Sequence, residues 1–336
     1  MATLYVTEPG ARIEKEYQRI LVSKKDDVLM AVPLRQLSEV VLMGWVGATT
    51  PAMLSLLDHG VGLSLINQNG KLRGRLRPAE IRNIALRKIQ YARQDDAPFL
   101  KMMTRSLVLG KLTNCRTMAR RVLRKLDNGQ NETLEQLNSQ FIRLVDSLEK
   151  VNKTQQIDVL RGLEGTGTKA YFAILRAGLR CQDFIKRTRR PPTDPVNALL
   201  SLGYTLLGDS LFTACEIVGL DPYAGYFHTQ KYGRPALALD LMEEFRPIIV
   251  DSIVLRLVNQ HMLKPADFYT TDEGGVFLQR RGLAVFFREY TRRLATKVYH
   301  PLAQRSISYQ KCFEVQARHL RKVIEGEPHY QPMKVK

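Results

Sequence analysis

The sequence has few cysteines and none of the common nucleotide-binding or hydrolase loops. Its 336 residues include four cysteines, widely separated and without a Cys-x-x-Cys pair, which excludes a disulfide scaffold and argues against a cysteine-based zinc site. It lacks a Gly-rich phosphate loop ending in Lys-Ser/Thr and a Gly-x-Ser-x-Gly motif, which argues against an NTPase or a serine hydrolase. Because Glu8, Arg12 and Glu14 interrupt the start of the chain, we expect no secretory signal and a cytoplasmic protein with reduced thiols.

Acidic residues are scarce relative to basic ones. The chain has 51 Lys and Arg against 33 Asp and Glu, a formal net charge of +18. The segment 97–126 contains eight basic residues and no acid, and the segment 176–190 contains six basic residues and one acid. A run of one sign repels itself unless an anion neutralises it, so we expect nucleic acid as the partner. The alternative is a basic protein without a polyanionic partner.

Long apolar runs are also missing. The most apolar stretch, residues 196–215, is interrupted by Asn197 and Asp209. We therefore interpret it as a buried helix and expect no membrane partner.

The first 76 residues have the pattern of a β domain. A helix is expected to begin at Thr50, which can cap it, and to end at Gly60. Asn69-Gly70 lies between two alternating runs and predicts a hairpin. After that turn Lys71, Arg73 and Arg75 share one strand face, which either protects a sheet edge or faces phosphate. The short apolar runs that predict strands are 4–6, 20–22, 28–32, 40–43 and 61–66.

From about residue 81 the apolar spacing becomes helical. We predict an α+β multidomain fold, with a β-rich N-terminal domain over 1–80, a linker helix over 81–94, an all-helical domain over 95–325 and a mobile tail over 326–336. Asp127-Asn128-Gly129 is expected to end a helix. The predicted helices are 81–94, 97–126, 131–151, 154–178, 195–218, one from about 235, 281–299 and 301–325.

The best candidate site is His228 followed by Asp240, Glu243 and Glu244. Asp240 and Glu243 are three residues apart, so on a helix their carboxylates share one face. Carboxylates held together repel each other unless a cation neutralises them. One histidine with several carboxylates suits Mg²⁺ or Mn²⁺ better than a structural zinc ion. The alternative is an acidic, solvated helix face.

A further ligand is needed to close such a site, and Glu164 is the candidate. It lies between Gly162 and Gly165 in a helical pattern, where glycine costs about 1 kcal/mol relative to alanine. Close approach of a neighbouring group would offset that cost. The alternative is a solvated glutamate at a helix end.

Several segments together resemble the CRISPR-associated protein one family, the metal-dependent endonuclease and integrase of CRISPR adaptation. They occur in the family's order and span nearly the whole chain. The segments are MGWVGATTPAMLSLLDHGVGLSLINQNGKLRGRL (43–76), LRGLEGTGTKAYF (160–172), TRRPPTDPVNALLSLGY (188–204), GLDPYAGYFH (219–228) and GRPALALDLMEEFRP (233–247).

The resemblance implies that the N-terminal β domain dimerises and that the helical domain is catalytic. Glu164, His228 and Glu243 match the family's metal ligands and catalytic residues. Asp240 matches a second acid, and Glu244 is adjacent and stays a candidate ligand.

The resemblance also implies a homodimer, the small CRISPR-associated protein two as partner, and double-stranded DNA as substrate, both foreign fragments and CRISPR repeat DNA. A 3′-hydroxyl of the incoming DNA would attack a phosphodiester at the repeat. The candidate DNA contacts are Arg189, Arg190, Arg120, Arg121 and Arg124. Two rival functions stay open, a stand-alone nuclease acting on branched DNA in repair and a non-catalytic DNA-binding scaffold.

Overall fold

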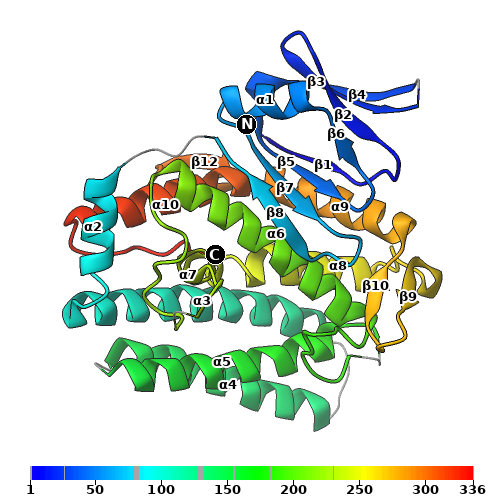
Figure 1. Ribbon diagram of the computed structural model, residues 1–336. Helices are drawn as coiled ribbons and strands as arrows, with labels where there is room; N and C mark the ends of the chain where they lie inside the picture. The colour runs from blue at the N-terminus through cyan, green and yellow to red at the C-terminus, as the bar shows by residue number, and fades with distance from the viewer. Residues whose placement is uncertain are drawn as a thin grey trace. The chain divides into compact units, whose positions relative to one another are not determined.

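The computed structural model describes residues 2–25, 27–78, 83–126, 132–153, 156–181, 184–229 and 231–335 (Figure 1). The chain forms two compact units. The first unit contains residues 1–81, 188–205 and 263–289, and the second contains 82–187, 206–262 and 290–336. The sequence predicts one boundary near residue 80. The division is less simple because two later segments join the N-terminal strands in the first unit.

The first unit holds two four-stranded sheets with the orders β1-β5-β7-β8 and β4-β3-β2-β6. Fully buried Ile13, Ile20, Val40 and Leu56 belong to its apolar core. Its elements are β1 (Ala2–Val6), β2 (Arg12–Glu16), β3 (Arg19–Lys24), β4 (Asp27–Pro33), η1 (Leu34–Gln36), β5 (Leu37–Met43), β6 (Gly47–Ala48), α1 (Thr50–Asp58), β7 (Gly62–Ile66), β8 (Leu72–Leu76), η3 (Pro265–Asp267), β9 (Phe268–Thr270) and β10 (Val276–Leu278).

The predicted hairpin and helix of this unit are confirmed. Antiparallel β7 and β8 flank Asn69-Gly70, and Gly70 has a φ of +75°, a conformation that favours glycine. Strand β8 lies at the sheet edge, with Lys71 and Arg73 exposed, as the edge interpretation requires. Helix α1 is capped by Thr49, one residue before the predicted cap. Strand β2 was not predicted because Ile13 is its one buried residue among charged neighbours.

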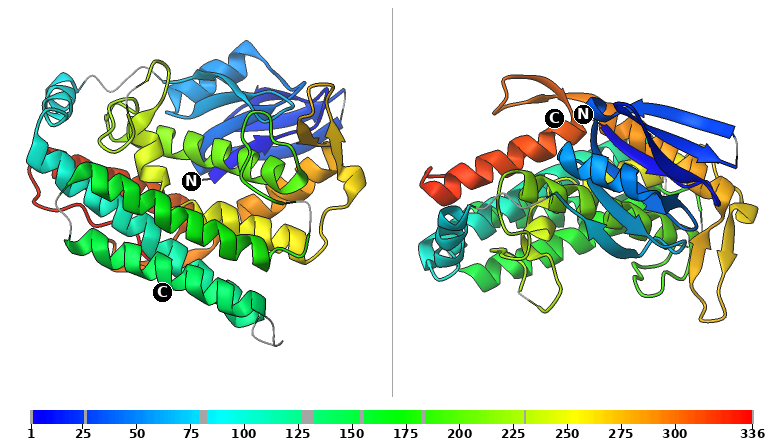
Figure 2. Two further views of the ribbon diagram at one scale, coloured as in Figure 1. Left: turned by 90° about the horizontal axis from the view of Figure 1, so that it is seen from below. Right: turned by 45° about the horizontal axis from the view of Figure 1, so that its top comes forward.

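The second unit is mainly helical. Helices α3, α4 and α5 pack on one another (Figures 1 and 2), and their apolar spacing predicted all three. The described elements wholly within this unit are α2 (Ile84–Ala92), α3 (Ala97–Leu126), α4 (Glu132–Lys153), α5 (Ile157–Gly178), α7 (Ala236–Met242), the π-helical η2 (Pro247–Asp251), α8 (Ser252–Asn259), β11 (Lys297–His300), β12 (Arg305–Ser308) and α10 (Tyr309–Glu325).

Two long helices are shared between the units. Helix α6 (Pro195–Ile217) belongs to the first unit up to residue 205, and α9 (Arg280–Ala295) belongs to it up to residue 289. Helix α6 is apolar and long enough to cross a membrane, but 72% of its most apolar window is buried within the protein. This burial agrees with its interpretation as a core helix.

The C-terminal part differs from the prediction in two ways. The helix predicted over 281–299 ends at Ala295, and the antiparallel pair β11–β12 follows, so the second unit is not wholly helical. The tail is not mobile as predicted, because Tyr330, Met333 and Val335 are at least 92% buried. The predicted helix end at 127–129 and the start of the linker helix at 81–82 lie outside the described residues.

Candidate metal centre

The predicted acids and His228 come from four pieces of the second unit. Glu164 lies on α5, and His228 lies in the loop before α7. Asp240 is on α7, and Glu243 follows directly after that helix. A lysine on α3, Lys111, completes the group. All these residues belong to one compact unit.

Asp240 organises the loop that carries His228. Its Oδ2 accepts from the backbone N–H groups of Tyr226 at 2.6 Å and Phe227 at 3.0 Å. Its Oδ1 accepts from the backbone N–H of His228 at 2.9 Å and contacts Nδ1 of the ring at 2.7 Å. Asp240 is only 1% exposed. Both oxygens are therefore engaged by protein groups, and Asp240 holds the loop and the ring of His228 in place.

Gly225 permits this arrangement. A Cβ at this position would lie 2.6 Å from the backbone carbon of Ala236 and 2.8 Å from Oδ2 of Asp240. The loop can therefore press against the start of α7 only where it carries no side chain.

The second ring nitrogen of His228 faces Glu243. Its Nε2 lies 3.6 Å from Oε1 of Glu243, too far for a hydrogen bond. With Nδ1 held by Asp240, Nε2 stays available as a ligand atom, the arrangement found around metal-bound histidines. The side chain of His228 is 16% exposed.

Lys111 joins the two glutamates. Its ammonium pairs with Oε1 of Glu164 and lies 2.6 Å from Oε2 of Glu243. It is buried in α3, and the two carboxylates outweigh the effect of burial and raise its pKa. A positive charge thus lies between the two predicted carboxylate ligands.

Glu243 is buried yet ionised. Burial alone would raise its pKa, but Arg246, Lys111 and His228 outweigh that effect and lower the pKa to about 2. Arg246 lies 3.2 Å from Oε1 of Glu243. Oε2 of Glu243 is buried and lies beside the Lys111 ammonium, so a bound metal ion would share or take over the place of that positive charge.

Glu244 points to a different environment. Its carboxylate accepts from the backbone N–H of Met333 at 2.7 Å, the hydroxyl of Tyr330 at 3.0 Å and the amide of Gln316 at 3.1 Å. Burial raises its pKa to about 8, although these hydrogen bonds oppose the shift. The structure does not bring Glu244 to the predicted ligands.

The chemistry of the three other candidate ligands, Glu164, His228 and Glu243, suits a hard divalent cation. Two carboxylates and one imidazole nitrogen are donors that Mg²⁺ and Mn²⁺ accept. Among the described residues, no three His, Cys, Asp or Glu side chains already stand at ligand distances. The Lys111 ammonium contacts both Glu164 and Glu243 in this arrangement.

The whole-chain comparison settles the family. A family model described as CRISPR associated protein Cas1 matches residues 4–292. The chain belongs to the Cas1 family. It is 34% identical over 331 residues to the CRISPR-associated exonuclease Cas4/endonuclease Cas1 fusion of Geobacter sulfurreducens, covering 96% of this chain and 58% of the fusion. It is 35% identical over 341 residues to CRISPR-associated endonuclease Cas1 2 of Rhodospirillum rubrum, covering 97% of each.

A solved structure gives the same result. The chain resembles the Cas6-RT-Cas1–Cas2 complex with a TM-score of 0.82 and 25% identity, over 100% of this chain and 36% of the solved one. The predicted Cas1 resemblance and the predicted combination of β-rich and helical parts are thus confirmed.

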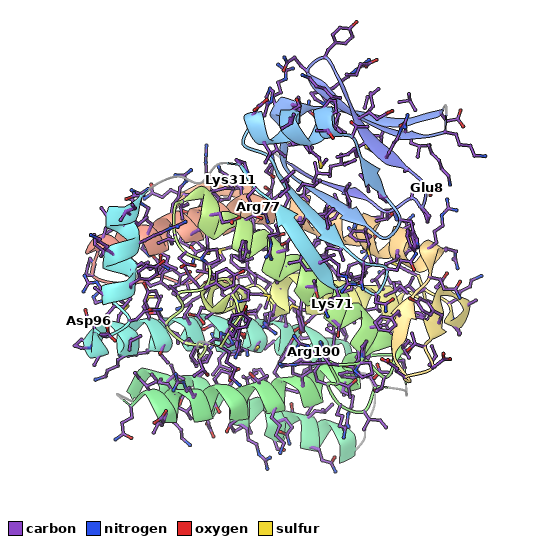
Figure 3. All side chains as sticks on the ribbon, viewed as in Figure 1. Glu8, Lys71, Arg77, Asp96, Arg190 and Lys311 are labelled. Carbon is purple, nitrogen blue, oxygen red and sulfur yellow. The ribbon has the colours of Figure 1, made fainter. Side chains whose placement is uncertain are left out.

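The predicted DNA contacts of this Cas1-family chain lie on its surface. Arg120, Arg121 and Arg124 are exposed on the C-terminal half of α3. Arg189 and Arg190 are exposed in the first unit, and Figure 3 labels Arg190. Their exposure leaves them available to phosphate.

Sequence reasoning missed Lys111 and Arg246. A signal for Lys111 existed, because it falls on the apolar stripe of α3 with Leu107, Val108 and Cys115, which are buried. A lysine on such a stripe needs a buried partner. Arg246 carried no such signal.

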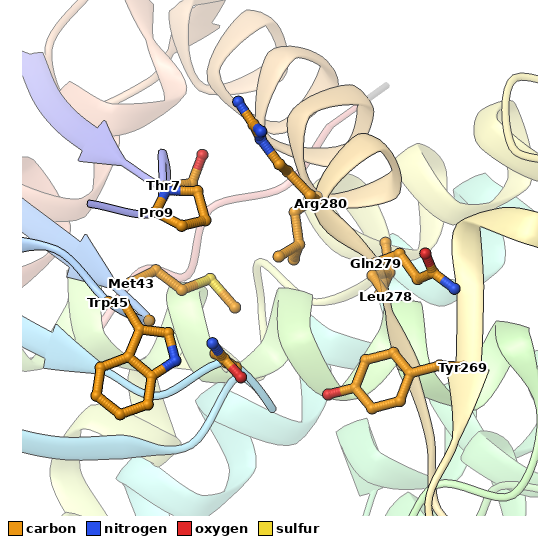
Figure 4. Close-up of a pocket in the computed structure, with 11 residues that line it drawn as sticks. Thr7, Pro9, Met43, Trp45, Tyr269, Leu278, Gln279 and Arg280 are labelled. Atoms are coloured by element: carbon orange, nitrogen blue, oxygen red, sulfur yellow. The ribbon is translucent and has the colours of Figure 1, made fainter. Parts of the chain in front are cut away.

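A separate pocket lies wholly in the first unit. It measures about 260 Å³ and lies between the Trp45 and Tyr269 side chains, with Met43 and Arg280 also on its wall (Figure 4). The candidate metal ligands all belong to the second unit, so this pocket is not the candidate centre.

Proposed function

We propose that this Cas1-family protein is a metal-dependent DNA endonuclease and integrase that inserts short foreign DNA, as new spacers, into a CRISPR repeat array. The observation that carries the proposal is that Lys111 joins Glu164 to Glu243 while Nε2 of His228, whose ring is held by Asp240, faces Glu243. The names of its relatives, which are CRISPR-associated endonucleases, support the same activity.

Glu164, His228 and Glu243 would hold Mg²⁺ or Mn²⁺. When bound, such an ion neutralises charge on the attacked phosphate and lowers the pKa of the nucleophile. Asp240 keeps Nδ1 of His228 engaged, so that Nε2 faces the ligand group. Arg246 and Lys111 keep Glu243 ionised at neutral pH.

The reaction is a phosphodiester exchange. In integration, the 3′-hydroxyl of the incoming strand gives up its proton to solvent, and its oxygen bonds to phosphorus in the repeat. The bond from that phosphorus to the neighbouring 3′-oxygen breaks, and this oxygen leaves as a hydroxyl after taking a proton. In hydrolysis, water replaces the incoming hydroxyl. The exposed arginines, Arg120, Arg121, Arg124, Arg189 and Arg190, would position duplex phosphates.

The proposed assembly is a homodimer that works with CRISPR-associated protein two. A complex whose name includes Cas1 and Cas2 contains a chain that matches this one over its full length, which supports this partner. Integration joins two DNA ends at a fixed separation, so it needs two active sites in a fixed relation, which a symmetric dimer supplies.

The test incubates the purified protein with a short duplex and a repeat-containing supercoiled plasmid, with and without the partner protein. We expect Mn²⁺-dependent joining at the repeat ends that requires the partner. Cleavage of branched DNA without any joining would favour a repair nuclease. DNA binding without metal-dependent cleavage would favour a scaffold.

A second measurement concerns affinity. Neutralising six to ten phosphates predicts a slope of log K against log salt of roughly −5 to −9. Replacing Arg120, Arg121 and Arg124 by Gln should make that slope shallower by up to about 3. An unchanged slope would remove this cluster from the DNA path.

A further inference from the structure

The C-terminal segment Tyr330–Val335 is bound into the second unit by side chains rather than by a sheet. The segment forms hydrogen bonds to Glu244, as described above. It also bonds to the side chain of Asn114, which accepts from the backbone N–H of Val335 at 3.0 Å and donates to the carbonyl of Met333 at 2.8 Å. Thr117 donates to the carbonyl of Val335 at 3.1 Å. The ring of Tyr330 stacks on that of His319 at 5.4 Å between centroids. We call residues 330–335 the C-terminal clasp.

The clasp holds the two elements that carry the core of the metal centre. Asn114 lies three residues after Lys111 on α3, and Glu244 is adjacent to Glu243. Asn114 also donates to the backbone carbonyl of Glu244 at 2.7 Å. The clasp therefore completes a bridge between α3 and the segment after α7, directly behind the 2.6 Å contact of Lys111 with Glu243.

The clasp also provides hydrogen-bond partners for buried polar side chains. Asn114, Glu244 and Gln316 are each fully buried, and the clasp supplies hydrogen-bond partners to all three. Buried polar groups that lose their partners rearrange or draw in water, because leaving them unpaired is costly. Without the clasp, Asn114 and Glu244, which lie next to Lys111 and Glu243 on the two segments, would each lose hydrogen-bond partners.

One glycine makes the docking of the clasp possible. A Cβ on Gly110 of α3 would lie 2.5 Å from Cβ of Pro332. The proline ring is rigid and cannot move aside without the backbone of the clasp. Gly110 is also in the interior of a long helix, where glycine lowers stability relative to alanine. Its presence is explained by the close approach of the clasp.

We propose that the C-terminal clasp positions the metal centre, with Glu244 and Asn114 as the positioning residues that transmit its effect to Glu243 and Lys111. This inference rests on the proposed function, because it assigns those two residues to the catalytic site. In this proposal Glu244 positions the metal centre and is no longer a candidate metal ligand. A misplacement of about 1 Å at such a site can cost about 100-fold in rate.

The test uses the full chain with Gly110→Ala, which displaces the clasp while keeping a good helix former in α3. We expect the backbone amides of Met333 and Val335 to lose protection from hydrogen exchange. Turnover at saturating Mn²⁺ and DNA should fall at least about tenfold, while DNA affinity stays within about twofold because the arginines are untouched. The matched control is Gly208→Ala in α6, where the new Cβ would lie an ordinary 3.6 Å from the sulfur of Met242.

A second substitution separates positioning from general damage. Pro332→Gly removes the colliding carbons, so the double variant Gly110→Ala/Pro332→Gly should regain both amide protection and most of the turnover. Turnover that persists while the amides lose protection would overturn the proposal. A loss of turnover with full amide protection would overturn it as well. A wild-type chain without metal-dependent activity would instead overturn the proposed function itself, before any variant is compared.

Discussion

Two neighbouring glutamates lie in opposite environments of the second unit. Glu243 is surrounded by Lys111, Arg246 and His228, and its pKa falls to about 2. Glu244 is enclosed by neutral groups of Gln316, Tyr330 and Met333, and its pKa rises to about 8. Glu243 has helical backbone angles, so the next side chain points about 100° away. Consecutive residues of one helical turn thus face different surroundings. Glu243 faces the charged groups of the candidate metal centre, and Glu244 faces the uncharged groups that support it.

The largest effect should come from Glu243→Gln, which keeps the shape and removes the charge. We expect Mn²⁺-dependent DNA cleavage to fall about 1,000-fold or more, which corresponds to about 4 kcal/mol of lost transition-state stabilisation. Duplex affinity should stay within about threefold, since phosphate contacts come from Lys and Arg. Cleavage of labelled duplex and a binding titration measure the two effects. Wild-type turnover in this variant would remove Glu243 from the site.

Lys111→Met tests the role of the ammonium group that contacts Glu164 and Glu243. Loss of one partner from a buried ion pair costs about 3–5 kcal/mol of folding stability, because Glu164 and Glu243 then lose the ammonium that contacts both carboxylates. Thermal unfolding should show a lower midpoint without metal and a larger increase on adding Mn²⁺ than in the wild type. Lys101→Met on the same helix is the control. If Mn²⁺ raised the unfolding midpoint equally in the wild type and the variant, Lys111 would not compete with the metal ion for the two carboxylates.

Asp240→Asn tests the support of His228. An amide cannot accept from all four groups that contact this carboxylate. We expect activity or metal affinity to fall about 10–100-fold. The control is Asp221→Asn in the same loop, whose carboxylate accepts from Tyr223 N–H and the hydroxyl of Tyr91. An equal loss in both variants would indicate a loop effect rather than an effect on His228.

The smallest effect should come from Glu244→Gln, the same chemical change as in the first prediction. The new amide can accept from Met333 N–H with its oxygen, and its nitrogen can donate to the hydroxyl oxygen of Tyr330. Turnover should therefore stay within about threefold of wild type, since the clasp contact survives. If Glu244→Gln lost as much turnover as Glu243→Gln, the proposed difference between the roles of Glu243 and Glu244 would be wrong.

The sequence was sufficient for the long helices and for the hairpin of the first unit. Long one-period stripes predicted α3, α4 and α5, and Asn69-Gly70 predicted the β7–β8 hairpin. The ligand candidates could be named because acids and a histidine at helical spacing restrict the chemistry. The mixed division into units could not be predicted, since nothing local indicates that residues 188–205 and 263–289 join the first unit.

The different surroundings of Glu243 and Glu244 could not be predicted from the sequence either. Spacing places Asp240 and Glu243 on one helix face, yet Asp240 is used by the backbone of residues 226–228. The tail over 326–336, which includes the clasp, was predicted to be mobile because it has two prolines and no core pattern. Its order comes from single side chains such as Asn114, which pair with backbone far away in the chain.

The composition of the first unit has a consequence for biosynthesis. Strands β1 to β8 are translated before residues 188–205 and 263–289, which belong to the same unit. Domains generally fold as units during synthesis. Here the strands cannot complete their unit until residue 289 has been translated. Its early strands are therefore a natural client for chaperones, and a gene fragment encoding only the β-rich start would yield an unfinished product.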